Sequence, residues 1–160
     1  DFPAMLELFS RAREGLKLSE DAHLATLPID KAAASLSAIL LDESYYDFLK
    51  SMVREVGGIP VLGEAAIIPF KARAWLDLTR QREEGGNVDE KNIRKHRNDV
   101  ARLLQLLSQE ARYELPSSVA DDMRSFVEQA TAEADYDPRQ FKVNMTRDDV
   151  ATRLRAAYQL

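Results

Sequence analysis

The sequence predicts an α+β fold, with a small mixed β-sheet over residues 1–62 and a helical bundle packed on it over residues 63–160. Two observations lead to this prediction. Up to residue 62 the apolar runs are short and broken by turn residues, as in strands. Beyond it, apolar residues recur at the three- and four-residue spacing of amphipathic helices. A chain of 160 residues that is 45% hydrophobic can also bury a sizeable core.

Four short segments are predicted to be extended. Residues 5–9 alternate in polarity, and residues 23–29 form a weaker candidate. Residues 36–41 form a continuous apolar run, which is typical of a strand buried on both faces. Residues 59–62 follow a turn at Gly57-Gly58. These segments predict the mixed sheet.

A short helix is predicted between the third and fourth of these segments. It covers residues 42–50, where Asp42 can cap the first turn. The spacing of Tyr46 and Leu49 places these two side chains inward.

The first two helices of the bundle are predicted to form a hairpin. One begins after Gly63 and ends in a glycine-containing loop at residues 83–87. The next begins near Asn87 or Asp89, and Asn87 with Glu90 resembles a capping box. A short loop between helices requires them to pack antiparallel.

Two further helices complete the predicted bundle. The first follows Pro116, and a break at Asp137-Pro138 separates it from the last. Thr146, with Asp149 three residues later, forms the capping-box pattern of a helix start.

Composition excludes several function classes. Cysteine is absent, so disulfides, thiolate zinc sites and thiol nucleophiles are excluded, and a cytoplasmic location is expected. No apolar run approaches the roughly 20 residues of a membrane span, so no membrane association is expected. A net charge of −5 does not attract nucleic acid on average, although a local basic face still can.

Three charged residues interrupt apolar faces, where an unpaired charge would be costly. Glu7 lies within the first strand, Lys71 lies on the apolar side of the first long helix, and Asp99 lies on the inward flank of the second. Each has two interpretations. Glu7 is either a solvent-facing carboxylate or a metal or base position, and Lys71 is either a snorkelling lysine or a phosphate ligand. Asp99 is either a structural partner of Lys71 or Arg73, or part of a catalytic Lys–Asp pair.

One basic run is a candidate nucleic-acid surface. Arg94, Lys95 and Arg97 flank His96 in a protein that is otherwise acidic. The alternative is a solvated helix face held by ion pairs one turn apart.

Several segments together resemble a known family. These are residues 58–62, residues 68–78 with Phe70-Lys71-Ala72-Arg73-Ala74-Trp75 at their centre, and residues 92–100 with Lys95-His96-Arg97-Asn98-Asp99-Val100; residues 2–10 and 36–42 also match. In these positions the chain resembles the AbiEii-like (abortive infection) nucleotidyltransferases of bacteria, many of them hypothetical proteins. The likeness covers residues 2–107.

The resemblance implies an activity and residues for it. In that family Mg²⁺ and a nucleoside triphosphate (NTP) are held on a nucleotidyltransferase sheet, and a helix pair supplies a lysine and an aspartate. By position, Glu7 resembles a third acid and metal ligand, Lys71 the helix lysine and Asp99 the final aspartate. Arg73 lies beside Lys71 as a further cofactor-binding position.

Two departures from the family pattern affect what can be transferred. Neither the Gly-Ser motif nor the Asp-x-Asp motif of the family is recognised anywhere in the chain, and we expect both upstream of Asp1. This chain alone is therefore expected to be inactive. His96 also stands where an aspartate is common in the family.

Three hypotheses for function follow. In the first, the intact protein transfers a nucleoside monophosphate from NTP to an RNA or protein acceptor, as the toxin of a toxin–antitoxin or abortive-infection system with an antitoxin partner. In the second, the chain is a non-catalytic interaction or nucleotide-binding module, with a homodimer among its partners and Tyr45, Tyr113 or Tyr136 exposed at the interface. In the third, the charged residues only stabilise the fold.

Overall fold

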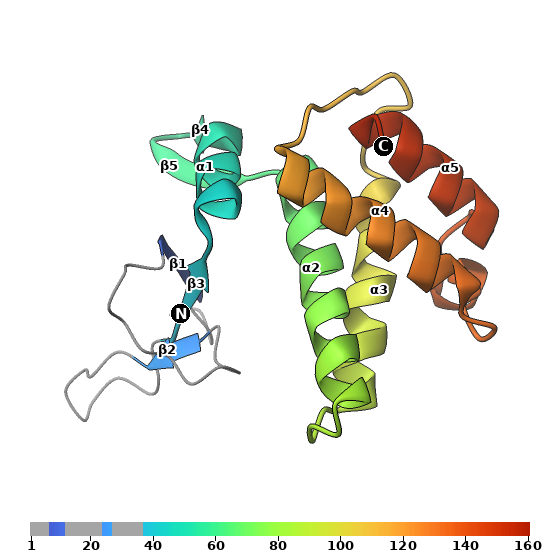
Figure 1. Cartoon of the computed structure of the whole chain (residues 1–160). Helices are drawn as coiled ribbons and strands as arrows, with labels where there is room; N and C mark the ends of the chain where they lie inside the picture. Colours follow the sequence, from blue (N-terminus) through green and yellow to red (C-terminus); the bar gives the residue numbers. More distant parts are fainter. Residues whose placement is uncertain (1–6, 12–23, 27–36) are drawn as a thin grey trace. The chain divides into compact units, whose positions relative to one another are not determined.

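The computed structural model describes residues 7–11, 24–26 and 37–160, and side chains from residue 42 onward (Figure 1). The contacts divide the chain into two units, Asp1–Ser51 and Met52–Leu160. Both strands and helices occur in the described ranges, so the fold mixes α and β structure. The division lies ahead of residue 62, because the last two strands belong to the same unit as the long helices.

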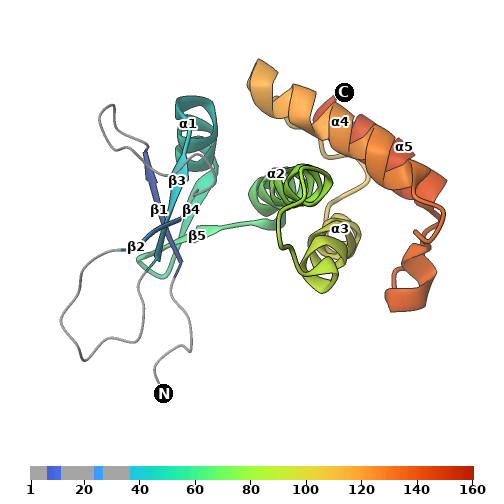
Figure 2. The same ribbon diagram turned by 60° about the horizontal axis from the view of Figure 1, so that its bottom comes forward.

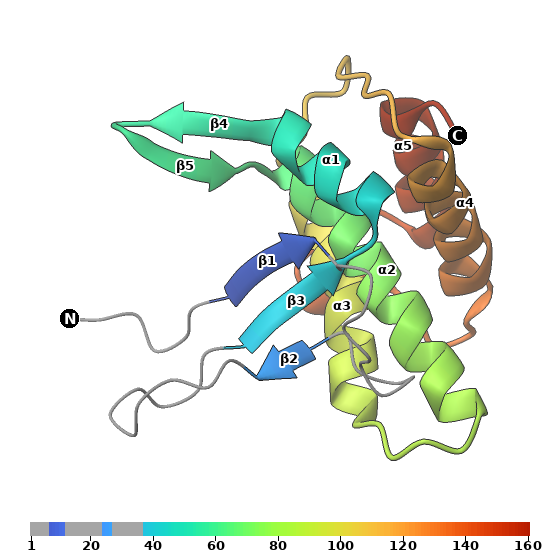
Figure 3. The same cartoon turned by 60° about the vertical axis from the view of Figure 1, so that its left-hand side comes forward.

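The first unit contains a three-stranded mixed sheet in the order β1–β3–β2 (Figure 3). β1 (Glu7–Arg11) pairs in parallel with β3 (Ser37–Leu41), and β2 (Leu24–Thr26) pairs with β3 in antiparallel. The central strand is β3, as its continuous apolar run predicts. Each of the three segments expected to be extended contains one of these strands, and the rest of each predicted range lies outside the described residues.

The helix α1 (Glu43–Met52) follows β3 and starts as predicted. The aspartate before it accepts a hydrogen bond from the Tyr45 amide at 3.0 Å. The buried side chains are Tyr45 and Phe48, so the prediction that Tyr46 and Leu49 face inward is wrong. Both pairs have the same three-residue spacing, and the sequence does not distinguish them.

A β-hairpin opens the second unit. β4 (Val53–Val56) pairs in antiparallel with β5 (Ile59–Leu62). Gly57 and Gly58 join the strands with φ values of 61° and 79°, and glycine adopts this left-handed backbone without steric cost. The sequence predicted the turn and β5, but it did not predict β4.

Four α-helices and one 3₁₀ helix follow in the described part of the second unit (Figures 1 and 2). They are α2 (Glu64–Glu83), α3 (Glu90–Leu104), α4 (Ser117–Ala132), η1 (Pro138–Phe141) and α5 (Arg147–Tyr158). α2 and α3 form an antiparallel hairpin, α4 packs on α2, and α5 packs on α3 and α4.

The caps of α5 and α3 lie at positions that the sequence indicated. Thr146 and Asp149 form the predicted capping box of α5, with both reciprocal hydrogen bonds present. The cap of α3 is Asp89, whose carboxylate accepts from the Lys91 amide at 2.9 Å. Of the two predicted starts, Asn87 and Asp89, the second is therefore confirmed, and Asn87 lies before the helix.

The core of the second unit lies between α2, α3, α4 and α5. Trp75 of α2 meets Phe126 of α4 edge to face, with ring centroids 5.3 Å apart. Other large side chains that are fully buried here are Tyr158, Ile68, Ile93, Leu104, Met123, Leu154, Val100, Val119, Val127 and Val143. Among the described helices, none is both long and apolar enough to cross a membrane.

One hydrogen bond joins the first and last helices of the bundle at a proline. Pro69 lies inside α2 and has no N–H, so it leaves the carbonyl of Ala65, four residues earlier, without its helical donor. The Tyr158 hydroxyl donates to this carbonyl at 2.9 Å. Ala65 is fully buried, and an unpaired carbonyl there would be costly, so α5 supplies what the proline removes.

Candidate functional site

The candidate site lies between α2 and α3, where a lysine meets an aspartate. Lys71 projects from α2, and its Nζ lies 3.6 Å from Oδ2 of Asp99 on α3. The two side chains are 30% and 21% exposed, so the pair is accessible to solvent. The structure therefore brings together two of the three residues that interrupt apolar faces in the sequence.

The loop that joins α2 to α3 sets how closely the two helices approach. A Cβ at Gly86 would lie 2.7 Å from Cγ and 2.8 Å from the carbonyl oxygen of Gln81. Only glycine fits this close approach to the backbone of α2. Beside the loop, Arg82 of α2 pairs with Glu90 of α3 at 3.2 Å. This tight connection makes the two helices antiparallel, which brings Asp99 opposite Lys71.

A second cation shares the aspartate. Arg102 donates from Nη1 to Oδ1 of Asp99 at 3.2 Å, and its guanidinium lies over the Phe141 ring at 5.3 Å. The sequence analysis did not single out Arg102, although its spacing of three residues from Asp99 on one helix was a usable signal. Asp99 is thus held by a hydrogen bond to Arg102 and by charge attraction to Lys71.

The geometry leaves the donors of Lys71 available. A separation of 3.6 Å is an ion pair but is too long for a hydrogen bond. Among the described residues, Asp99 is the only partner found for the Lys71 ammonium. Lys71 is therefore oriented by charge while its three N–H groups can still donate to a ligand, and a compact ammonium suits phosphate.

Arg73, two residues after Lys71 on α2, is engaged differently. Its Nε donates to both carboxylate oxygens of Asp77, at 3.0 and 3.2 Å, and its Nη1 donates to Asp122 of α4 at 2.7 Å. Burial by itself lowers the pKa of Arg73, but the two carboxylates outweigh it and hold that pKa above its usual value. Arg73 thus links α2 to α4, a partnership with Asp122 that the sequence did not indicate.

The basic run on α3 divides into two exposed residues and one buried residue. Arg94 and Lys95 are exposed. Arg97, by contrast, has a side chain only 4% exposed, which pairs with Glu133 and, at 3.1 Å, with Asp135. The nucleic-acid surface predicted from the sequence therefore loses Arg97, because its guanidinium is enclosed by carboxylates.

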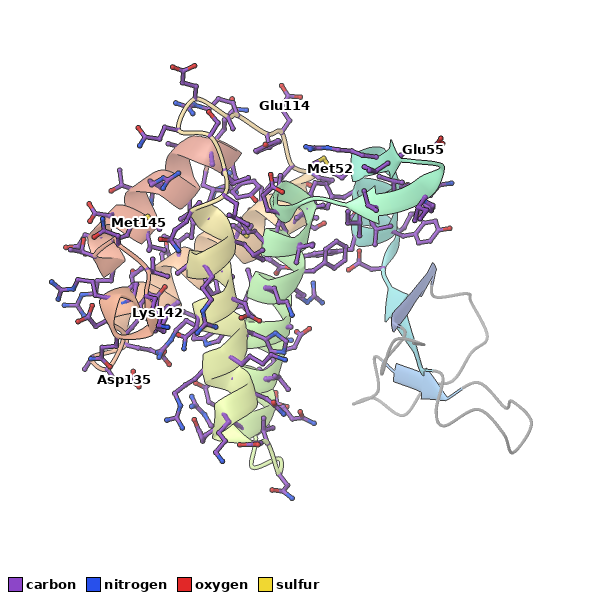
Figure 4. All side chains as sticks on the ribbon, turned by 180° about the vertical axis from the view of Figure 1, so that it is seen from behind. Met52, Glu55, Glu114, Asp135, Lys142 and Met145 are labelled. Atoms are coloured by element: carbon purple, nitrogen blue, oxygen red, sulfur yellow. The ribbon has the colours of Figure 1, made fainter. Side chains whose placement is uncertain are left out.

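The surroundings of Arg97 explain why a cation is tolerated there. Its guanidinium lies 4.6 Å from the centre of the Tyr136 ring, a cation–π contact that adds to the two ion pairs. Asp135 lies in the turn that follows α4 (Figure 4). Burial raises the pKa of Tyr136 to about 12, although the positive charge of Arg97 acts in the opposite direction.

One Asp-x-Asp triplet does occur in the sequence, in this same turn. Asp135 binds Arg97, and Asp137 caps η1 while its carboxylate binds Arg139 at 2.8 Å. The two carboxylates thus hold separate arginines, and the triplet does not lie on a strand. We therefore assign it to structure rather than to metal binding.

Glu7 lies in the other unit. It opens β1, opposite Ser37 of β3, and its side chain is outside the part of the chain whose side chains are described. Within the described residues, no group of three or more histidines and carboxylates is placed to hold a metal ion. The phosphate role of Lys71 and the metal role of Glu7 both stay predictions.

Tyrosines do not form the exposed surface that one hypothesis expects. Tyr45 and Tyr136 are buried and Tyr113 is half-buried, so that prediction is wrong for the first two. Among the described residues, most of the exposed large apolar side chains lie on the β4–β5 hairpin instead, where Val56 and Ile59 are each 63% exposed, and Leu106 after α3 is 68% exposed. β-branched residues in a strand carry no sequence signal that separates an exposed face from a buried one.

Comparisons of the chain with protein-family models, with curated proteins and with solved structures found no significant match.

Proposed function

We propose that this chain belongs to a nucleotidyltransferase-like protein, in which the α2–α3 hairpin supplies Lys71 to the phosphates of an NTP and Asp99 positions it. The intact protein would transfer the nucleoside monophosphate of the NTP to a hydroxyl of its acceptor and release pyrophosphate, in keeping with the resemblance to the AbiEii-like family. The mixed sheet of the first unit corresponds in this proposal to part of the nucleotidyltransferase sheet.

The observation that carries the proposal is the Lys71–Asp99 pair. Lys71 keeps its donors free at 3.6 Å from Asp99, and both side chains are within reach of solvent. Because Asp99 already binds Arg102, it can hold Lys71 in place without neutralising all of the positive charge of Lys71. A structural ion pair needs no such accessible ammonium.

Each residue of the pair has a separate role. Lys71 donates hydrogen bonds to the phosphate oxygens and offsets the charge that develops during transfer. Asp99 is a positioning residue, because it acts on Lys71 and not on the substrate. Bound Mg²⁺ supplies charge neutralisation at the triphosphate, and Glu7 is the residue of this chain proposed to assist in holding it.

Transfer of labelled nucleotide by the intact protein tests the proposal. We expect Lys71→Ala to abolish transfer or to reduce kcat/KM by about 100-fold or more, since an electrostatic contact to the transition state is lost. Lys71→Arg should restore part of the activity, because it keeps the charge. A matched control is Lys142→Asn, which removes an exposed lysine far along the chain at a left-handed position that asparagine tolerates.

Unchanged transfer in Lys71→Ala would remove this residue assignment. Absence of transfer in the intact wild-type protein would favour the second hypothesis, an interaction module. The exposed aliphatic side chains of the β4–β5 hairpin are the observation on its side. The partners expected under either hypothesis, an antitoxin or a second copy of the chain, stay predictions.

A further inference from the structure

One face of α3 is rich in basic and amide side chains. Between Lys91 and Arg102 the exposed residues of this helix are Lys91, Asn92, Arg94, Lys95 and Arg102, and none of them is acidic or apolar. This composition is unusual on a protein whose net charge is −5. We call Lys91, Arg94 and Lys95 the basic face of α3.

The cations of the basic face are unpaired. The structure shows no carboxylate within ion-pair distance of Lys91, Arg94 or Lys95 among the residues it describes. The nearby acids are already engaged, since Glu90 pairs with Arg82 and Asp99 pairs with Lys71 and Arg102. The alternative of a solvated face held by intrahelical ion pairs is therefore not what the structure shows for these three residues.

The buried Arg97 fixes the direction in which this face points. Its side chain and those of Ile93, Val100 and Leu104 occupy the inward side of α3. Residues at 91, 94 and 95 consequently lie on the outward side, because side chains three or four positions apart share a helix face. The basic residues at 94, 95, 97 and 102 thus differ in their surroundings, although the sequence alone does not show which of them is buried.

The row of residues on the outward side of α3 leads to the candidate site. Lys91, Lys95 and Asp99 follow one another at four-residue spacing, so each is about one helical turn, roughly 5–6 Å, from the next. Lys71 lies across from the last of them, 3.6 Å from Asp99. A chain of phosphates laid along Lys91 and Lys95 would therefore lead toward Lys71.

We propose that the basic face of α3 binds the sugar–phosphate backbone of a nucleic-acid acceptor and directs it toward Lys71. Cations repeated along a line match a string of phosphates, and amides such as Asn92 supply further hydrogen bonds to phosphate and sugar. An acidic protein partner is less well matched, because protein interfaces have an apolar or aromatic centre and this face exposes none. That the bound nucleic acid is the acceptor of the transfer rests on the proposed function. Binding of nucleic acid to this face is measurable by itself, without NTP.

The test measures binding of a fluorescein-labelled single-stranded RNA of mixed sequence to the full chain, by anisotropy, over a series of salt concentrations. In the triple variant Lys91→Ala, Arg94→Ala, Lys95→Ala we expect affinity at low salt to fall by about tenfold or more. The slope of log affinity against log salt should become shallower by about 2, since three phosphate contacts are lost from a single strand.

The control variant removes the same charge elsewhere. Arg124→Ala, Arg147→Ala and Arg155→Ala delete three exposed arginines from α4 and α5. RNA affinity should change by less than about twofold, because these residues lie off the proposed surface. Equal losses in both triple variants would show attraction by net charge alone and overturn the proposal.

Three other outcomes would also overturn it. These are no RNA binding by the wild-type chain, unchanged binding by the α3 variant, and competition by poly-glutamate that is as effective as competition by unlabelled RNA. Failure here is distinguishable from failure of the proposed function. A Lys71→Ala variant that keeps RNA binding and loses nucleotide transfer separates the acceptor surface from the triphosphate site.

Discussion

Arg97 and Asp99 lie two residues apart on α3 and take part in two very different charged clusters. Arg97 points to the segment after α4, where its side chain is 4% exposed and is bound by Glu133 and Asp135. Asp99 points to α2, where it is 21% exposed and holds Lys71 at a distance too long for a hydrogen bond. We call the buried cluster around Arg97 the closed cluster and the solvent-accessible cluster around Asp99 the open cluster.

The difference separates charges that hold the fold from charges that remain available to a ligand. A buried guanidinium must be paired, so losing its partners should cost stability. An accessible pair contributes little to stability, because water screens both charges. Substitutions in the two clusters should therefore affect different measurements.

The largest effect is expected where the closed cluster loses its carboxylates. In Glu133→Gln, Asp135→Asn, the buried Arg97 keeps its charge without a counter-ion. We expect the free energy of unfolding to fall by about 3 kcal/mol in urea denaturation.

A matched control for the closed cluster is Glu110→Gln, Glu128→Gln, which removes two exposed carboxylates from the same unit. Its unfolding free energy should change by no more than about 0.5 kcal/mol. A similar loss in both double variants would mean that net charge, and not the pairing of Arg97, decides stability.

The second-largest effect is expected at a buried hydrogen bond between uncharged groups, which tests whether such a bond also stabilises the fold. Tyr158→Phe leaves the buried carbonyl of Ala65 without a donor, and we expect a loss of about 2 kcal/mol. In a Pro69→Ala background the new amide at position 69 can donate to that carbonyl. The same tyrosine substitution should then cost less than about 1 kcal/mol. Additive losses in the double-mutant cycle would contradict this link between α2 and α5.

The third effect is on the pH dependence of the closed cluster. Burial raises the pKa of Tyr136 to about 12, from an ordinary value of 10.0. The unfolded chain therefore releases this proton first, and stability that is fully present below pH 10 is lost as pH rises toward 12. The expected loss from this residue between pH 10 and pH 11 is about 1 kcal/mol.

Tyr136→Phe isolates this contribution, because the Tyr136 hydroxyl is buried and has no hydrogen-bond partner among the described residues. The substitution should be close to neutral at pH 7 and should flatten the stability profile above pH 10. An unchanged alkaline profile would show that other groups govern it.

The smallest effect on stability is expected in the open cluster. Asp99→Asn removes the charge between Lys71 and Arg102, and the free energy of unfolding should change by no more than about 0.5 kcal/mol. If Asp99 positions Lys71, the KM for NTP in the intact protein should nevertheless rise several-fold. A stability loss as large as that of the closed cluster, with KM unchanged, would make this pair structural.

Local signals in the sequence were sufficient for most of the secondary structure. The spacing of apolar residues predicted the four long helices, and the Thr146–Asp149 pattern predicted the start of α5, because a capping box involves residues of one turn only. Gly57-Gly58 predicted a tight turn for the same reason. The strand β4 was missed, since Val53–Val56 directly continues α1 without a turn residue between them and is recognisable only through its pairing with β5.

The candidate site was predictable in part. Helix periodicity and a short loop indicated that Asp99 pairs with Lys71 or Arg73 of the adjacent helix, and the structure selects Lys71. The separation of Arg97 from Arg94 and Lys95 did not follow. It depends on Glu133 and Asp135, which lie more than thirty residues away in the sequence.

Most helices and strands follow from the sequence alone, as does the position of several charged residues on apolar faces. Only the tertiary structure decided which of these charges are closed and which are open. Helix periodicity assigns a side chain to a face, but it does not say what lies against that face. The burial of Arg97, the pairing of Arg73 with Asp122 and the bond from Tyr158 to Ala65 all join residues far apart in the chain. Such contacts depend on how the helices pack together, which no short window of sequence specifies.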